Sequence, residues 1–224
     1  MKHLDPASDG FRNLVRARVQ SCLEQSVQAS AASHILFLVL EYHRKSWGLV
    51  GGAPRAWATG LEEPGDLDVV VGGTMEDVDA VVRAWVSRVP ASATVERTKL
   101  GGYRLTSSSD VIDLWAAPAT VAIARERVRD SKRYRAVAKS AALSLDSLVL
   151  TSEGTLYDFG FFRTLRTGTL ELNHTHIERK ERIVAKAQHL CRTYGLTPDL
   201  TLQGMIAEER EKRACHSSQL ALQF

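Results

Sequence analysis

The sequence is poor in cysteine, and the few cysteines it has do not form a recognisable framework. Among its 224 residues only Cys22, Cys191 and Cys215 are cysteines. An odd, widely spaced set without a CxxC pair argues against a disulfide scaffold and against a structural zinc site. Reduced thiols favour a cytoplasmic protein, and we expect this one to be cytoplasmic.

Long hydrophobic runs are also missing. The most apolar stretch covers residues 35–40 and is followed at once by charged residues. A membrane-spanning helix needs about 20 consecutive apolar residues. Residues 1–11 are polar and contain no apolar core of a secretion signal. We therefore expect no membrane partner.

The chain has no strong excess of charge of either sign. Its formal net charge is +3, with 44% hydrophobic and 25% charged residues, which is ordinary for a globular protein. The length is sufficient for a real hydrophobic core. A charge this small permits a nucleotide or nucleic-acid partner without requiring one.

Helical and strand patterns are both present. Apolar spacing predicts helices over 9–28, with Asp9 as cap, 30–45 and 74–87, and strands at 49–50, 66–71, 94–99, 103–106 and 111–115. A very basic helix is expected over 117–138, extended segments at 143–150 and 156–158, and helices from His176 onward, with Gly195 as a stop. Because short turns join the later strands, the pattern indicates an α+β fold with a small mixed sheet flanked by helices.

Three segments follow from this order of elements. Residues 1–46 are N-terminal helices packed on the core, 47–173 form the main domain, and 174–224 form a short helical C-terminal part. The tryptophans are expected in the hydrophobic core: Trp47, Trp57 and Trp115.

Two carboxylates share one face of a strand. Asp66 and Asp68 open an otherwise apolar strand, and alternate residues of a strand point the same way. Such a pair stays hydrated unless a cation sits between its members, which is the arrangement of a magnesium-dependent phosphoryl-transfer site. Upstream, Gly51 and Gly52 offer backbone N–H groups that a phosphate can approach closely. The alternative reading is a solvated pair at the strand edge.

A third carboxylate lies in a later strand. Asp113 stands among apolar residues, which is unfavourable unless something pairs with it. If its strand lies beside Asp66 and Asp68, the three acids could hold two Mg²⁺ ions about 4 Å apart. Asp110, at the strand start, is expected off the site. The alternative reading of Asp113 is an ion pair with an arginine such as Arg104.

These stretches resemble a known family. Residues 51–55, Gly60 and 66–70 look like the head-domain signature of polymerase-β-type nucleotidyltransferases, nearest to bacterial poly(A) polymerase and tRNA CCA-adding enzymes. Residues 101–105 and 111–115 are similar to the hairpin that presents the family's third carboxylate. Residues 139–146 and 154–158 resemble the segment that closes the head. The resemblance covers residues 47–173.

The resemblance implies roles for particular residues. Asp66 and Asp68 would ligate two Mg²⁺ ions, for which Mn²⁺ is expected to substitute, and Asp113 would complete the site as ligand or general base. Nucleotide contacts would come from Gly51 and Gly52 on the β- and γ-phosphates, from Arg55 on phosphate or as a brace of its loop, and from Lys139.

The implied reaction moves a nucleoside monophosphate from an NTP such as ATP to a hydroxyl, expected on an RNA such as the tRNA 3′ end held by the basic segment. The family's acid after the arginine is Ala56 here, and only residues 174–224 follow the head. Templated CCA addition is therefore not expected, and a toxin or defence enzyme with an antitoxin or other protein partner is considered. The alternatives are an antibiotic or protein acceptor, or a degenerate protein that binds a nucleotide or a partner.

Overall fold

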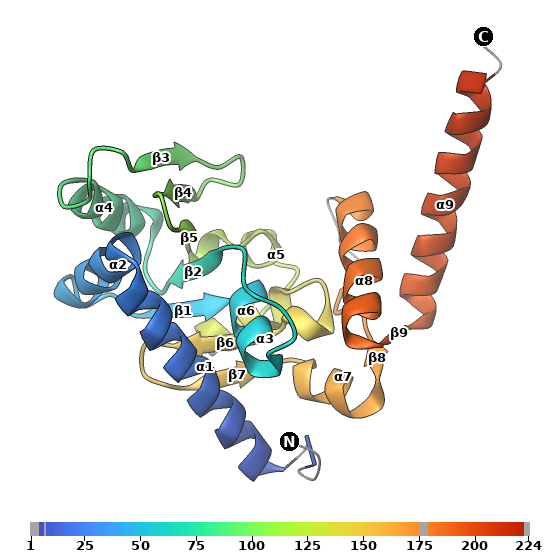
Figure 1. Ribbon diagram of the computed structural model, residues 1–224, viewed down its shortest axis with the longest axis horizontal. Helices are drawn as coiled ribbons and strands as arrows, with labels where there is room; N and C mark the ends of the chain where they lie inside the picture. Colours follow the sequence, from blue (N-terminus) through green and yellow to red (C-terminus); the bar gives the residue numbers. More distant parts are fainter. Residues whose placement is uncertain (1–4, 7, 175–178, 222–224) are drawn as a thin grey trace.

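A seven-stranded mixed sheet forms the centre of the molecule, in the order β3-β4-β5-β2-β1-β6-β7 (Figure 1). The computed structural model describes residues 5–6, 8–174 and 179–221, with side chains described as far as residue 212. Strands β2 and β5 run parallel, and the other described neighbours in this sheet are antiparallel. The predicted α+β class is confirmed.

The strands lie close to the predicted positions. Those of the central sheet are β1 (Trp47–Val50), β2 (Leu67–Val71), β3 (Thr94–Arg97), β4 (Tyr103–Thr106), β5 (Val111–Ala116), β6 (Leu148–Thr151) and β7 (Leu156–Asp158). A separate parallel pair, β8 (Thr169–Leu170) and β9 (Thr197–Pro198), was not predicted. At two residues each, these strands are too short to give an alternation pattern.

Three amphipathic helices cover one face of the sheet: α1 (Asp9–Ala29), α2 (Ala31–Tyr42) and α4 (Met75–Val86). The predicted cap of α1 was one residue too late. Ser8 is the cap, because its side chain accepts a hydrogen bond from the Phe11 N–H at 3.2 Å. Thr74 caps α4 as predicted, in a capping box with Asp77.

The alternation along β2 separates the two faces. Leu67, Val69 and Val71 are buried under the helices, whereas Asp68 and Val70 point to the opposite face. In β5, Ile112 and the other even-numbered residues point to the helices in the same way. The opposite face therefore carries the polar residues of both strands.

The basic segment is not one helix, contrary to the prediction for 117–138. It divides into η1 (Ala117–Ala119), α5 (Val121–Ala124) and α6 (Arg133–Ser140). Glu126 adopts a left-handed backbone with φ 53°, and Asp130 accepts a hydrogen bond from the Lys132 N–H at 2.9 Å. Residues 125–132 also lack the apolar spacing that holds a helix against a sheet, so only the two ends are helical.

The remaining helices and turns precede or follow strands β1, β6, β7 and β8 in the sequence. The predicted extended segment 143–150 begins with a turn, η2 (Ser144–Asp146), before β6, and α7 (Phe161–Thr167) follows β7. Helix α3 (Gly52–Thr59) follows β1. Helix α8 (Lys180–Tyr194) ends at Gly195 as predicted, with φ 64°. The predicted helix start at His176 lies outside the described residues.

Helix α8 lies between the sheet and α9 (Leu200–Ala221), and α9 extends away from the body (Figure 1). Val184, Ala187 and Leu190 of α8 join the same hydrophobic cluster as Phe11 of α1 and Val69 of β2. The three segments proposed from the sequence thus share one core, and their exact boundaries remain a prediction. Among the described helices none is long and apolar enough to cross a membrane.

Candidate active site

The three predicted carboxylates lie on one face of the sheet. Asp68 of β2 is the register partner of Asp113 in the parallel strand β5. Asp66 directly precedes β2 and, two residues before Asp68, lies on the same side. The predicted neighbourhood of the two strands is confirmed. Asp110, which was expected to lie off the site, accepts a hydrogen bond from the Ser33 hydroxyl of α2 at 2.7 Å.

Asp68 is in an environment that disfavours its charge. Burial first, and then the nearby charges of Asp66 and Asp113, raise the pKa of its carboxyl to about 7, against an opposing effect from Lys186. A cation nearby would stabilise the charged form of this carboxylate. The residues present therefore suit a positively charged group at Asp68.

Asp113 already has a cationic partner. Arg104 of β4 donates from Nε to Asp113 Oδ1 at 2.8 Å and from Nη2 to Oδ2 at 2.6 Å. The ion pair between Asp113 and Arg104, which was the alternative interpretation, is thus present. Asp113 also lies beside Asp68, as the interpretation as a third site carboxylate requires. Its role as a metal ligand stays a prediction.

Two of the carboxylates, Asp66 and Asp68, suit Mg²⁺ as ligands. Within the described ranges no group of three or more His, Cys, Asp or Glu side chains is arranged to hold a metal ion. Mg²⁺ keeps several waters and usually takes only one or two carboxylates together with substrate phosphates. Asp66 and Asp68 would supply those two, and two ions as well as their replacement by Mn²⁺ remain predictions.

The glycine pair lies at the start of α3, beside Asp68. Gly51 is the N-cap of α3, with φ 74° and ψ −129°, and a β carbon there would be 2.5 Å from Asp68 Oδ2. Both observations require glycine at position 51. A β carbon at Gly52 would meet only the Arg55 side chain, at 3.7 Å. The N–H groups of the first turn of a helix have no partner within the helix, and Gly52 borders the same cavity as Asp66 and Asp68.

Arg55 is buried and engaged with acids. Its Nε donates to Glu62 at 2.7 Å, its Nη2 lies 2.6 Å from the same carboxylate, and its Nη1 pairs with Asp146. Burial by itself would lower the pKa of this guanidinium, but the two acids raise it above the ordinary value. Arg55 thus braces α3 against η2, and its predicted phosphate contact stays untested. Ala56 is buried, and Glu62 and Asp146 provide the acids that hold the arginine.

Lys186 is a site residue that the sequence pattern did not reveal. Its Nζ lies 2.7 Å from Asp146 Oδ2, and it borders a cavity of about 350 Å³ together with Gly52, Asp66 and Asp68. Lys186 comes from α8, far along the chain from the carboxylates. Its position at helical spacing on an amphipathic helix gave no signal that it faces the site.

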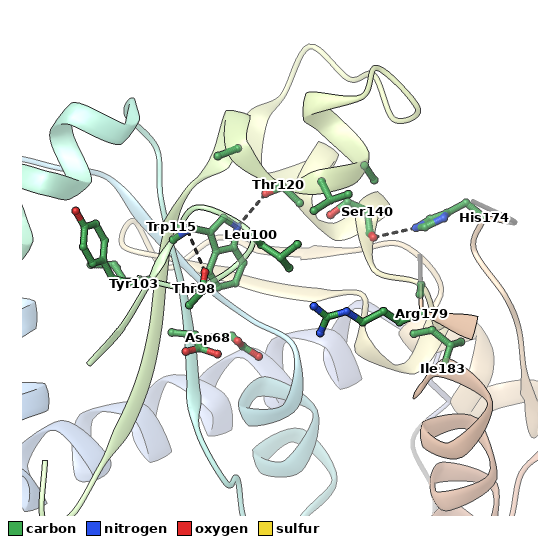
Figure 2. Close-up of a pocket in the computed structure, with 17 residues that line it drawn as sticks. Asp68, Thr98, Leu100, Tyr103, Trp115, Thr120, Ser140, His174, Arg179 and Ile183 are labelled. Atoms are coloured by element: carbon green, nitrogen blue, oxygen red, sulfur yellow. Dashed lines mark hydrogen bonds between the residues drawn. The ribbon is translucent and has the colours of Figure 1, made fainter. Parts of the chain in front are cut away.

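A second, largely apolar cavity of about 450 Å³ also borders the carboxylates (Figure 2). Asp68 and Asp113 border it together with Leu100, Trp115 and Ile183. Trp115 was expected in the core, but it is only half-buried and lines this cavity, where its Nε1 donates to the Thr120 hydroxyl at 3.0 Å. Trp57 is buried as predicted.

Two basic groups of the 174–183 region frame this cavity. The Arg179 guanidinium points into it from the start of α8, and His174 Nε2 lies 3.0 Å from the Ser140 carbonyl oxygen (Figure 2). Neither residue was singled out from the sequence as a site residue. Both precede the periodic part of α8, so no pattern marks them.

The predicted contact Lys139 lies elsewhere. Its Nζ is 2.6 Å from Asp130 Oδ2 and 5.5 Å from the ring centre of Phe159. Lys139 is absent from the described linings of both cavities. Asp130 also pairs with Arg135 at 3.1 Å, so part of the basic segment is neutralised internally. The nucleotide or acceptor contact predicted for Lys139 stays untested.

Comparison with known proteins gives structural matches without sequence matches. No protein-family model and no curated protein matches the chain. A CCA-adding enzyme solved with CTP superposes with a TM-score of 0.60 at 17% identity, over 89% of this chain and 47% of that one. A tRNA nucleotidyltransferase complexed with a primer tRNA and an incoming ATP analogue gives 0.57 at 18% identity, over 77% and 49%.

The fold is that of the tRNA nucleotidyltransferases. The Thermotoga maritima CCA-adding enzyme complexed with tRNA agrees, with a TM-score of 0.57 at 15% identity over 93% of this chain and 44% of that one. The chain spans about half the length of these structures. The nucleotidyltransferase fold, which the resemblance of residues 47–173 implied, is thereby confirmed.

Proposed function

We propose that the protein transfers a nucleoside monophosphate from an NTP to a hydroxyl acceptor, with the 3′ end of an RNA such as tRNA as the acceptor. The observation that carries the proposal is the placement of Asp66, Asp68 and Asp113 on one sheet face beside the glycine-led start of α3. The likeness to enzymes complexed with CTP, ATP and tRNA adds support.

The triphosphate would lie in the polar cavity. The N–H groups at Gly51 and Gly52 and the Lys186 ammonium would hold its β- and γ-phosphates. Asp66 and Asp68 would hold Mg²⁺, which would supply positive charge to neutralise the phosphates. These residues would act mainly by positioning and electrostatics.

The acceptor would approach from the side of Asp113. Its hydroxyl oxygen would bond to the α-phosphorus, the bond from that phosphorus to the bridging oxygen of the β-phosphate would break, and pyrophosphate would leave. Asp113 would orient the hydroxyl and receive its proton. Arg104 would keep Asp113 in position meanwhile.

Label transfer tests the proposal directly. The protein is incubated with each of the four α-labelled NTPs, Mg²⁺ and total RNA, and the labelled product is identified. Wild type and Asp79→Asn, a change at an acid of α4 that pairs with Arg97, should label RNA, whereas Asp68→Asn should not. The proposal fails if no NTP gives label on any acceptor, or if Asp68→Asn labels as wild type does.

A small-molecule acceptor is the second candidate, because the cavity beside Asp113 is largely apolar and Lys139 is paired internally. Salt separates the two candidates. Transfer to RNA should weaken steeply between about 50 and 200 mM salt, since each phosphate contact releases counterions. Transfer to a small molecule should change little over that range. A toxin or defence role, with an antitoxin as partner, would require the RNA acceptor or a protein acceptor.

A further inference from the structure

Arg104, Asp113 and Asp68 form a row across three neighbouring strands. Arg104 is the register partner of Asp113 in the antiparallel pair β4–β5, and Asp113 is the register partner of Asp68 in the parallel pair β5–β2. Register partners project from the same face of a sheet. The guanidinium therefore belongs to the same surface as the carboxylates.

Arg104 and Asp113 form a bidentate contact through two nitrogens and two oxygens. Nε and Nη2 reach one carboxylate oxygen each, at 2.8 and 2.6 Å. Nη2 also lies 3.8 Å from Asp66 Oδ2. A two-pronged arginine–carboxylate contact is among the stronger charged hydrogen bonds and fixes orientation. One fixed positive charge is thus shared by two of the three acids.

Arg104 does little for the rest of the fold. Its side chain is 44% exposed, and the ion pairs found for it among the described residues are with Asp113 and Asp66 alone. Arg97 on the adjacent strand β3 behaves differently, since it pairs with Asp79 and the Tyr103 hydroxyl on α4 and β4. An exposed arginine whose ion pairs in the described part of the chain are both with these carboxylates points to a role at the carboxylates themselves.

We propose that Arg104 is the built-in second cation of the nucleotide-free site, so that Asp66 and Asp68 take one divalent ion and Asp113 takes none. Three carboxylates, one guanidinium and one divalent ion together are electrically neutral. A second divalent ion would leave a net positive charge, and it would have to displace the guanidinium from Asp113. The inference rests on the metal role given to Asp66 and Asp68 in the proposed function. It predicts that a second ion enters only with the negative charge of a nucleotide.

Counting bound Mn²⁺ without nucleotide tests this. Mn²⁺ titration followed by electron paramagnetic resonance should give one ion per wild-type chain. Arg104→Ala should bind two, and Arg104→Gln should agree as a variant that keeps more of the side chain. Arg97→Ala, which removes the neighbouring arginine, should bind one. The double variant Arg104→Ala with Asp113→Asn should return to one, because the extra ion would depend on the freed Asp113 carboxylate.

Two Mn²⁺ ions on the wild type, or none, would overturn the inference, and so would an unchanged count in both Arg104 variants that fold as wild type by circular dichroism. The count does not depend on turnover. If it behaves as expected while no acceptor is ever labelled, the inference stands and the proposed function fails. If label transfer is found with two ions on the nucleotide-free wild type, the proposed function stands and the inference fails.

Discussion

Gly51 and the Asp68 carboxylate are in such close contact that a β carbon on Gly51 would lie 2.5 Å from Asp68 Oδ2. The turn into α3 and the central acid of the sheet are therefore fitted to each other. This contact places the start of α3 next to Asp68, the buried acid whose charge is disfavoured. The space at Asp68 therefore permits only glycine at position 51.

Gly51→Ala should lower the free energy of unfolding by about 1–3 kcal/mol, because the backbone at φ 74° is strained for any residue with a β carbon. Gly52→Ala is the matched control, since a β carbon there meets only an ordinary contact at 3.7 Å and alanine favours a helix. Urea unfolding of both variants measures the difference. Equal free energies of unfolding for the two would show that the constraint at Gly51 is absent.

Asp68→Asn should stabilise the protein without metal at alkaline pH. The folded-state pKa of Asp68, about 7, lies above its ordinary value of 3.8, so its stabilising contribution is complete below pH 3.8 and lost as the pH rises through 7. The difference in unfolding free energy between variant and wild type should therefore grow by up to about 1.4 kcal/mol per pH unit over that window.

Added Mg²⁺ should stabilise wild type and leave Asp68→Asn unchanged. Urea unfolding from pH 4 to 8, with EDTA or Mg²⁺, provides the measurement, and parallel pH curves would contradict it.

Asp146→Ala should destabilise the fold strongly, by about 3–5 kcal/mol, because it leaves the buried Arg55 guanidinium with one acid fewer and frees Lys186. Burial alone would raise the pKa of Asp146, but the charges of Lys186 and Arg55 hold it below the ordinary value. Its stabilising contribution is therefore present above the ordinary pKa and lost as the pH falls through the lower, folded-state value. Acid unfolding should occur at a higher pH in Asp146→Asn than in wild type, and an unchanged midpoint would refute this.

Lys186→Gln should weaken NTP binding more than it weakens folding, because the Lys186 ammonium borders the polar cavity. A loss of about tenfold in affinity corresponds to about 1.4 kcal/mol, within the range of one charged hydrogen bond. Lys180→Gln is the control on the same helix, since Lys180 pairs with Glu208 of α9. Isothermal titration with a non-hydrolysable NTP compares the two. A loss in both, or in neither, would remove Lys186 from the phosphate site.

The alternation of residues explains why the carboxylate site could be predicted. Once 66–71 and 111–115 are recognised as strands, the alternation of side chains decides the face on which each residue lies. Burial of the apolar residues on one face places Asp66, Asp68 and Asp113 on the other. The hairpin turn at 107–110 also fixes the register that brings Arg104 opposite Asp113. The sequence offers that pairing as an alternative, but the order of residues does not show whether the ion pair accompanies or replaces the carboxylate site.

Contacts between distant segments escaped prediction. Lys186 reaches the site through the packing of α8, and nothing in its spacing distinguishes it from a solvated lysine. The ion pair between Lys139 and Asp130 was likewise not visible in the sequence, and the nucleotide or acceptor contact that the resemblance implies for Lys139 stays a prediction. The break at 125–132 depends on Glu126 and Asp130, which carry no glycine or proline signal. The position of Lys186 is determined by tertiary packing, whereas the break at 125–132 follows from local turn chemistry that hydrophobic spacing does not show.

The late position of α8 in the sequence also has a consequence for synthesis. A nascent chain made only as far as α7 contains the glycine turn and all three carboxylates, but it lacks Lys186 and the apolar side chains of α8. On a ribosome, the acids would thus be translated before the lysine that opposes their charge. The polar cavity bordered by Asp66, Asp68 and Lys186 is therefore completed only after α7 has been synthesised.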